Sequence, residues 1–212
     1  MFFDSCKALG RLLAASLACL PVVASAQNFQ VAIDTTPLSG QSGFIAFDLY
    51  QGDPGTSNQV VVTAFTTTSQ LGTASVFGNV VGGLATTLTL SSTNFFSEYL
   101  QGTAFAAGVT SFTVSLGDQY TPGNIPDSFA IFLLDASGVP FATSDPNGAD
   151  ALVAVDLRAP LAPQVFESSA AAATVTPLSA VPEPSAALLL GLGLLPLLSR
   201  AGRRQQQCMP RV

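Results

Sequence analysis

The chain has 212 residues, a formal net charge of -6, only 9% charged side chains, and neither histidine nor tryptophan. The absence of histidine excludes the commonest general base, the commonest metal-ligating side chain and the imidazole of a Ser or Cys catalytic triad. Residues 27–180 contain 11 acidic side chains and the single base Arg158. Such a surface repels phosphate backbones, so we expect no binding to nucleic acid.

The N-terminus has the order of a secretory signal peptide. Two basic residues precede the apolar run 12–23, and small residues that include Ala24 and Ala26 follow it. This order predicts a signal peptide over residues 1–26, recognised by signal peptidase at Ala24 and Ala26. The mature chain is then expected to begin at Gln27.

Residues 27–158 predict an all-β domain, a β-sandwich or jelly-roll-like fold, because short β-rich segments alternate with turn residues. Residues 110–116 alternate apolar and hydroxyl side chains, which predicts a strand with one face exposed to solvent. Residues 129–134 are apolar throughout, which predicts a central strand covered on both faces. Further strands are expected over residues 44–50, 59–65, 84–90 and 150–157.

One segment has a helical pattern. Asn94 is a candidate N-cap, Glu98 falls in the first turn and Gly102 is a stop signal. We therefore expect a short helix over residues 94–101.

The body offers weak candidates for binding chemistry. Asp145, Asn147 and Asp150 form its densest oxygen cluster and are weak calcium candidates, although Ala149 departs from the pattern of an EF-hand loop. A simple turn is the favoured interpretation of this cluster. No sequence spacing pairs two acids in the manner of a glycoside hydrolase, so we expect no catalytic residue and no cofactor.

The three tyrosines of the body, Tyr50, Tyr99 and Tyr120, are candidates for a carbohydrate-contacting surface. Their alternative role is to cap the core, which is the commoner one for this residue type.

The composition changes after residue 158. Residues 159–180 are rich in Ala, Pro, Thr and Ser, which predicts a linker. The apolar run 186–198 then predicts a single C-terminal membrane helix. A basic cluster behind it is expected to anchor the C-terminus in the cytoplasm, so that the body faces the other side of the membrane. The motif before the run is Val181, Pro182, Glu183 and Pro184, and the basic cluster is Arg200, Arg203 and Arg204.

The order of motif, apolar run and arginines over residues 181–204 resembles the PEP-CTERM sorting signal of Gram-negative bacteria. The tail 205–212 is longer than the usual few residues after the arginines. The resemblance implies export, an inner-membrane intermediate and processing by an exosortase. The periplasm, the cell surface or the extracellular matrix is then the destination, with exopolysaccharide as a candidate partner.

The body is also similar to PEP-CTERM proteins that have no assigned activity. The similarity rests on residues 38–44, on 96–105 with its Gln101-Gly102 pair, and on 132–135 together with 143–146. It implies the fold and the sorting route only.

The favoured interpretation is a non-enzymatic secreted or surface-displayed protein of the cell envelope or biofilm matrix. The alternative is a calcium-dependent carbohydrate-binding or adhesion module, motivated by the acidic body and the loop that begins at Asp145. A hydrolase would require two acids that converge in a cleft within about 10 Å of each other.

Overall fold

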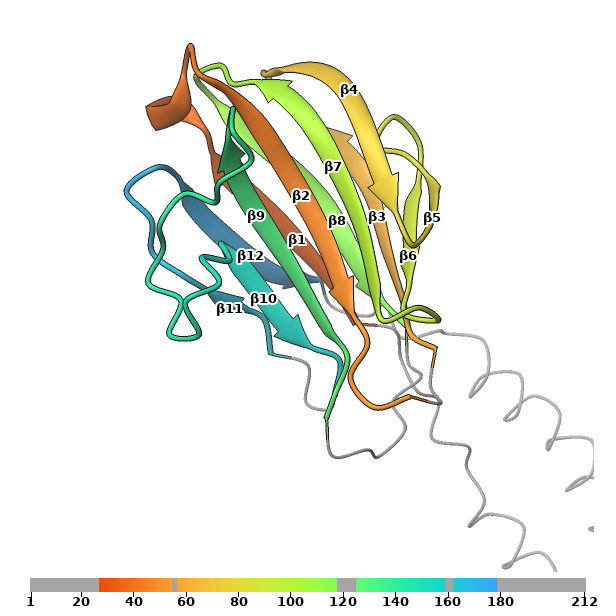
Figure 1. Cartoon of the computed structure of the whole chain (residues 1–212). Coiled ribbons are helices and arrows are strands. Elements are labelled where there is room, and N and C mark those ends of the chain that lie inside the picture. Colours follow the sequence, from red (N-terminus) through yellow and green to blue (C-terminus); the bar gives the residue numbers. More distant parts are fainter. Residues whose placement is uncertain (1–26, 55–56, 118–124, 159–161, 179–212) are drawn as a thin grey trace, which may run out of the picture. The chain divides into compact units, whose positions relative to one another are not determined.

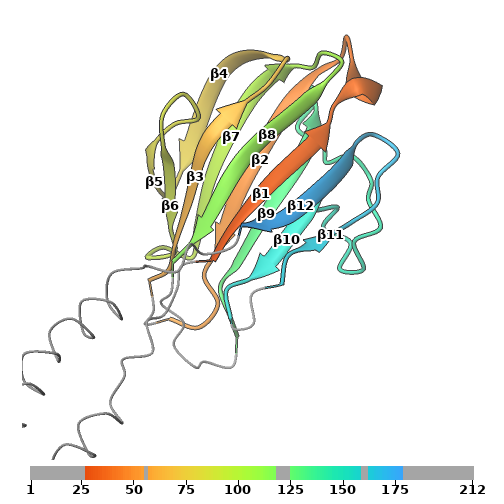
Figure 2. The same ribbon diagram turned by 180° about the vertical axis from the view of Figure 1, so that it is seen from behind.

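The computed structural model describes residues 27–54, 57–117, 125–158 and 162–178, which form two antiparallel sheets packed face to face (Figure 1). The all-β prediction is therefore confirmed. The strand order is β12-β1-β8-β3-β6-β5 in the first sheet, here called sheet A, and β11-β10-β9-β2-β7-β4 in the second, sheet B. Figure 1 is seen from the side of sheet B and Figure 2 from the side of sheet A.

The strands of sheet A are β1 (Gln27–Asp34), β3 (Gln59–Thr66), β5 (Asn79–Gly82), β6 (Leu88–Ser91), β8 (Val109–Leu116) and β12 (Ala172–Leu178). Those of sheet B are β2 (Ser42–Tyr50), β4 (Gln70–Phe77), β7 (Phe96–Ala104), β9 (Ser128–Asp135), β10 (Val153–Asp156) and β11 (Gln164–Val165). A short 3-10 turn, η1 (Thr36–Leu38), joins β1 to β2.

The two segments with the clearest sequence patterns form the strands predicted for them. In β8 the alternating apolar residues Phe112, Val114 and Leu116 are buried, and the hydroxyl residues between them are only partly buried. In β9 the apolar run is covered on both faces, since alternate residues pack in the inter-sheet core and in a second cluster on the outside of sheet B. In both strands, the pattern of apolar side chains matches the faces of the strand that are buried.

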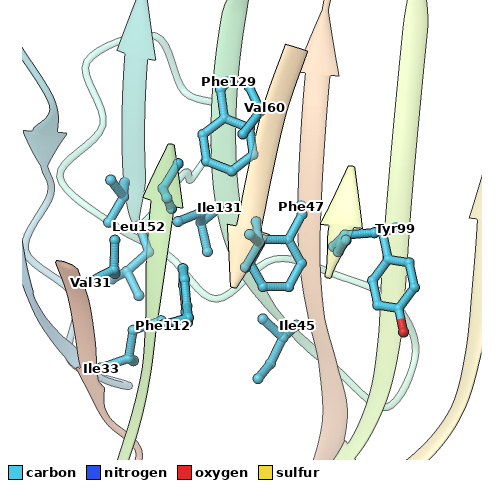
Figure 3. Packing of buried hydrophobic residues seen from close by; sticks show 14 of the residues in the cluster. Val31, Ile33, Ile45, Phe47, Val60, Tyr99, Phe112, Phe129, Ile131 and Leu152 are labelled. Atoms are coloured by element: carbon cyan, nitrogen blue, oxygen red, sulfur yellow. The ribbon is translucent and has the colours of Figure 1, made fainter. Parts of the chain in front are cut away.

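The main core lies between the sheets and is rich in aromatic and branched side chains (Figure 3). Phe47 of β2 meets Phe112 of β8 edge to face, with ring centroids 5.2 Å apart. This contact joins sheet B to sheet A at the centre of the domain. Because the core uses one face of each sheet, the opposite face of sheet B is left for other contacts.

The expected helix over residues 94–101 is wrong, because residues 96–101 form the first part of β7. Ser97, Tyr99, Gln101 and Thr103 are buried on one side of the strand, which is the two-residue period of a sheet. Pairing with β2 on one side and β4 on the other supplies the backbone hydrogen bonds. Tertiary pairing therefore overrides a weak helical signal.

The linker predicted over residues 159–180 also needs correction. Strand β11 extends sheet B beside β10, and β12 pairs with β1 along seven residues of sheet A. Small Ala and Thr side chains suit an edge strand, where half-exposed positions alternate. The sheets therefore extend past the boundary predicted at residue 158, and only residues 179 and 180 separate β12 from the Val181 motif.

The described residues contain no helix that is long and apolar enough to cross a bilayer. The predicted signal peptide, residues 1–26, and the predicted sorting segment, residues 181–204, lie outside the described residues.

Candidate functional site

The outer face of sheet B is built by the alternation of β2. Ile45, Phe47 and Leu49 point into the main core, so Asp48 and Tyr50 must point to the other side of the sheet. Tyr50 is 37% exposed there, as expected for a surface position. Asp48 is only 6% exposed, which is unusual for a carboxyl group on the outer face of a sheet.

The strand register brings two acids together. Asp48 of β2 lies directly opposite Glu98 of β7, and Glu98 lies directly opposite Phe77 of β4. Residues that face each other in an antiparallel pair have Cβ atoms about 5 Å apart and share one face of the sheet. One row across sheet B therefore contains two carboxyl groups and an aromatic ring.

Among the described residues, Asp48 has a side-chain hydrogen bond with one neighbour only. The Tyr50 hydroxyl donates a hydrogen bond of 2.9 Å to Oδ2 of Asp48, whereas Oδ1 is buried and has no hydrogen-bond partner. Burial raises the pKa of Asp48 to about 7; the Tyr50 hydrogen bond opposes this rise and the nearby Glu98 charge adds to it. Burial also raises the pKa of Glu98 and, together with the Asp48 charge, that of the Tyr50 hydroxyl.

Three aromatic rings extend from this acid pair along the surface. The ring centroids of Tyr50 and Phe96 are 4.9 Å apart, and those of Phe96 and Phe77 are 5.9 Å apart. The ring planes are tilted by 32° in the first pair and by 35° in the second. Phe77 is 62% exposed, so this run of rings is an open apolar surface bordered by carboxyl groups. We call Asp48, Tyr50, Phe77, Phe96 and Glu98 the aromatic-acidic patch.

The aromatic-acidic patch offers hydrogen-bond acceptors beside exposed aromatic rings. Asp48 cannot easily reach a bound molecule, because one of its oxygens is occupied by Tyr50 and the other is shielded from solvent. Glu98 is the half-buried and more accessible carboxyl group of the pair. The arrangement therefore differs from a catalytic pair in which both acids touch the substrate.

Sequence spacing did not reveal this acid pair. Asp48 and Glu98 are fifty positions apart, and Glu98 was assigned to a helix that does not form. The usable signal was the period of two in residues 96–104, which places Glu98 on the face opposite the buried Tyr99.

The three tyrosines weighed as carbohydrate contacts or as caps of the core have different environments. Tyr50 belongs to the aromatic-acidic patch, whereas Tyr99 is buried in the core and its hydroxyl donates a hydrogen bond of 3.1 Å to Oε1 of Gln101. Gln101 in turn donates to the carbonyl oxygen of Gly72 at a bulge in β4. Tyr120 lies outside the described residues.

The calcium candidates Asp145 and Asp150 bind the backbone of their own loop. Oδ1 of Asp145 accepts the Asn147 N–H at 2.9 Å, and Oδ1 of Asp150 accepts the Thr143 N–H at 2.9 Å. Asp150 has a φ of 61°, a conformation that Asp tolerates better than most residues. The described residues contain no group of three or more His, Cys, Asp or Glu that would suit a metal ion. These carboxylates therefore stabilise the turn by accepting hydrogen bonds from its backbone.

The remaining predicted sites cannot be placed, because they lie outside the described residues. They are the signal peptidase positions Ala24 and Ala26, the motif Val181, Pro182, Glu183 and Pro184, and the basic residues Arg200, Arg203 and Arg204.

Comparisons of the chain with protein-family models, with curated proteins and with solved structures gave no match.

Proposed function

We propose that the chain is a non-enzymatic protein of the cell envelope or exopolysaccharide matrix, exported by a signal peptide and sorted by an exosortase-type system. The observation that carries this proposal is the order of Pro182-Glu183-Pro184, the apolar run 186–198 and the arginines behind it. This order resembles the PEP-CTERM signal in all three of its parts.

Charge distribution supports the same topology. Only Arg158 is basic between residues 27 and 180, whereas arginines cluster after the apolar run. The positive-inside rule favours the cytoplasm for these arginines, and an acidic domain on the other side of the membrane agrees with it. The compact all-β body suits display outside the cell, because it contains no cysteine that an oxidising environment would alter.

The finer fold that we propose is a jelly roll. Successive strands β1 to β4 alternate between the sheets, and the orders β1-β8-β3-β6 and β2-β7-β4 suit the two halves of such a fold. Jelly rolls occur in lectins and in many unrelated proteins, so the fold alone does not select an activity.

The sorting proposal is tested by following the C-terminus of the chain in a host that has the exosortase and in a strain that lacks it. Mass spectrometry of the exported protein should find residues 200–212 removed only where the enzyme is present. A tail that stays intact in both strains would overturn the sorting route.

A matched pair of variants makes this test specific to the motif. Changing Pro182→Ala together with Pro184→Ala should block processing. Changing Pro160→Ala together with Pro163→Ala alters two prolines of the preceding Ala-rich segment and should leave processing intact. Equal processing of both variants would contradict a role for the motif.

The calcium-dependent carbohydrate-binding module is the second candidate, and the oxygen-rich loop at Asp145 is its only specific support. The carboxylates of that loop already accept backbone hydrogen bonds. Calorimetric titration of the protein with calcium chloride tests it, and a flat titration would remove this candidate.

A further inference from the structure

The aromatic-acidic patch differs from the scattered apolar residues elsewhere on the surface because its members converge. Phe77 and Tyr50 are both exposed and both contact Phe96, so the three rings form one run. Isolated exposed apolar residues are common in soluble proteins, whereas a cluster bordered by polar groups marks a binding surface.

A second and independent observation comes from Asp48. This side chain is more than nine-tenths buried beside Glu98, and its Oδ1 has no hydrogen-bond partner. A buried carboxyl oxygen without a partner is costly, so its presence at this position needs an explanation. Its other oxygen accepts the Tyr50 hydroxyl and so fixes the position of the ring that begins the aromatic run.

The chemistry of the patch limits what can occupy it. Carboxyl groups accept hydrogen bonds from hydroxyls, and flat rings pack against the C–H face of a sugar. The patch contains no cation, and the only basic residue from 27 to 178 is Arg158, which follows β10. An anionic polymer would therefore be repelled by Glu98, and by Asp48 in its charged form, with no cation in the patch to compensate.

We propose that Tyr50, Phe96 and Phe77 form an aromatic surface that binds an uncharged polysaccharide, with Glu98 accepting hydrogen bonds from its hydroxyl groups. Tyr50 and Phe96 pack partly face to face, with centroids 4.9 Å apart, and Phe77 is the most exposed ring of the run, so Phe77 supplies most of the aromatic contact with the sugar. Asp48 is a positioning residue that holds Tyr50 and does not contact the sugar. The inference goes beyond the sorting proposal and does not depend on it, because the site lies wholly on sheet B.

Affinity electrophoresis of the full chain in non-ionic detergent tests the inference. Native gels would contain mixed-linkage β-glucan, galactomannan or dextran as uncharged probes, and alginate as the anionic probe. At least one uncharged polysaccharide should retard the protein, alginate should not, and EDTA should leave the retardation unchanged. Retardation by none of the three uncharged probes, preference for alginate, or loss of binding in EDTA would each overturn the inference.

The chain supplies a matched control for the aromatic surface. Phe77→Ala removes an exposed ring of the run and should weaken binding roughly tenfold. Phe95→Ala removes a ring that is 75% exposed but belongs to none of the ring pairs in the patch, and it should bind as the unaltered chain does. An equal effect of the two substitutions would contradict the proposed surface.

Glu98→Gln provides the second variant, because it keeps the size of the side chain and removes the charged acceptor. Binding should fall several-fold while the circular dichroism spectrum and the thermal midpoint at pH 8 stay at or above those of the unaltered chain. Unchanged binding would overturn the role of Glu98. Size-exclusion chromatography with light scattering completes the test, since a dimer that Phe77→Ala dissociates would mean that a second copy, and not a glycan, covers the patch.

Discussion

Two buried aspartates, Asp127 and Asp48, occupy opposite kinds of environment in this domain. Asp127 accepts hydrogen bonds of 2.8 Å from the Gly52 N–H and from the side-chain amide of Asn58. It thereby ties the segment before β9 to both ends of the β2–β3 connection. Asp48 lies in the middle of a strand, receives one hydrogen bond from Tyr50 and leaves Oδ1 without a partner.

The difference between the two residues teaches how to separate a structural acid from a functional one. A carboxylate with both oxygens satisfied holds loops together, and its removal leaves buried donors without acceptors. A carboxyl group that is buried without sufficient partners is destabilising in its charged form, so its presence calls for another explanation. Burial alone does not distinguish the two cases, but the hydrogen-bond count does.

The largest expected effect is on the pH dependence of stability. Because burial raises the pKa of Asp48 from 3.8 to about 7, the folded state binds more protons than the unfolded state between these values. The free energy of unfolding should therefore fall as pH rises from about 4 to 7, by at most about 4 kcal/mol. Glu98, whose pKa burial also raises, contributes in the same direction.

Urea unfolding followed by circular dichroism from pH 4 to 8 measures this dependence. Asp48→Asn should flatten the profile, whereas Asp156→Asn, at an exposed position of β10, should leave it unchanged. A stability that rises steadily over this range in the unaltered chain would contradict the assigned environment of Asp48.

The next effect compares truncation of the two aspartates at pH 8. Asp127→Ala leaves the Gly52 N–H and the Asn58 amide without acceptors, so the free energy of unfolding should fall by roughly 3 kcal/mol. Asp48→Ala removes a buried charge that has one hydrogen bond and should cost much less. Chemical unfolding of both variants under identical conditions measures the difference, and equal losses would erase the distinction between the two acids.

A smaller effect is expected on the surface of sheet B. Phe77→Ala should lower the free energy of unfolding by only about 0.5 kcal/mol, because the ring is mostly exposed and, among the aromatic side chains that the structure describes, contacts Phe96 alone. Phe112→Ala, in the main core, should cost about 3 to 5 kcal/mol by the same measurement. A large loss in Phe77→Ala would mean that the ring serves the fold and not a ligand.

The smallest expected effect is a change in the pKa of Asp48. Tyr50→Phe removes the hydrogen bond that lowers the Asp48 pKa, so the midpoint of the pH profile should move upward. Glu98→Gln removes a repelling charge and should move the midpoint downward. Tyr99→Phe, whose hydroxyl binds Gln101, is the control and should not move it. Shifts of the same sign in the first two variants would contradict the assigned causes.

Strands with a strong side-chain period were predictable because the period reports directly which faces are buried. The alternation in β8 and the continuous apolar run in β9 both gave the correct strand and the correct burial. Strand β4 gave no such signal, since every one of its residues is exposed at the edge of sheet B. Its existence depends on pairing with β7 and not on its own composition.

The candidate site was not predictable for the same reason. Tyr50 was a candidate from its residue type, but its partners Phe96, Phe77, Asp48 and Glu98 come from three strands. Their proximity depends on the register of β2 with β7 and of β7 with β4. A shift of one residue in either pairing would place Glu98 on the opposite face of the sheet from its partner in that pairing.

The sequence by itself determined the class of the domain, its acidic character and the order of the tail that motivates the sorting proposal. These are properties of composition and local order, which do not depend on distant contacts. Only the tertiary structure decided that residues 96–101 lie in a strand, that β12 completes sheet A and that Asp48 lies opposite Glu98. Each of these follows from strand pairing between distant segments, and the energy of that pairing lies in contacts that no single segment contains.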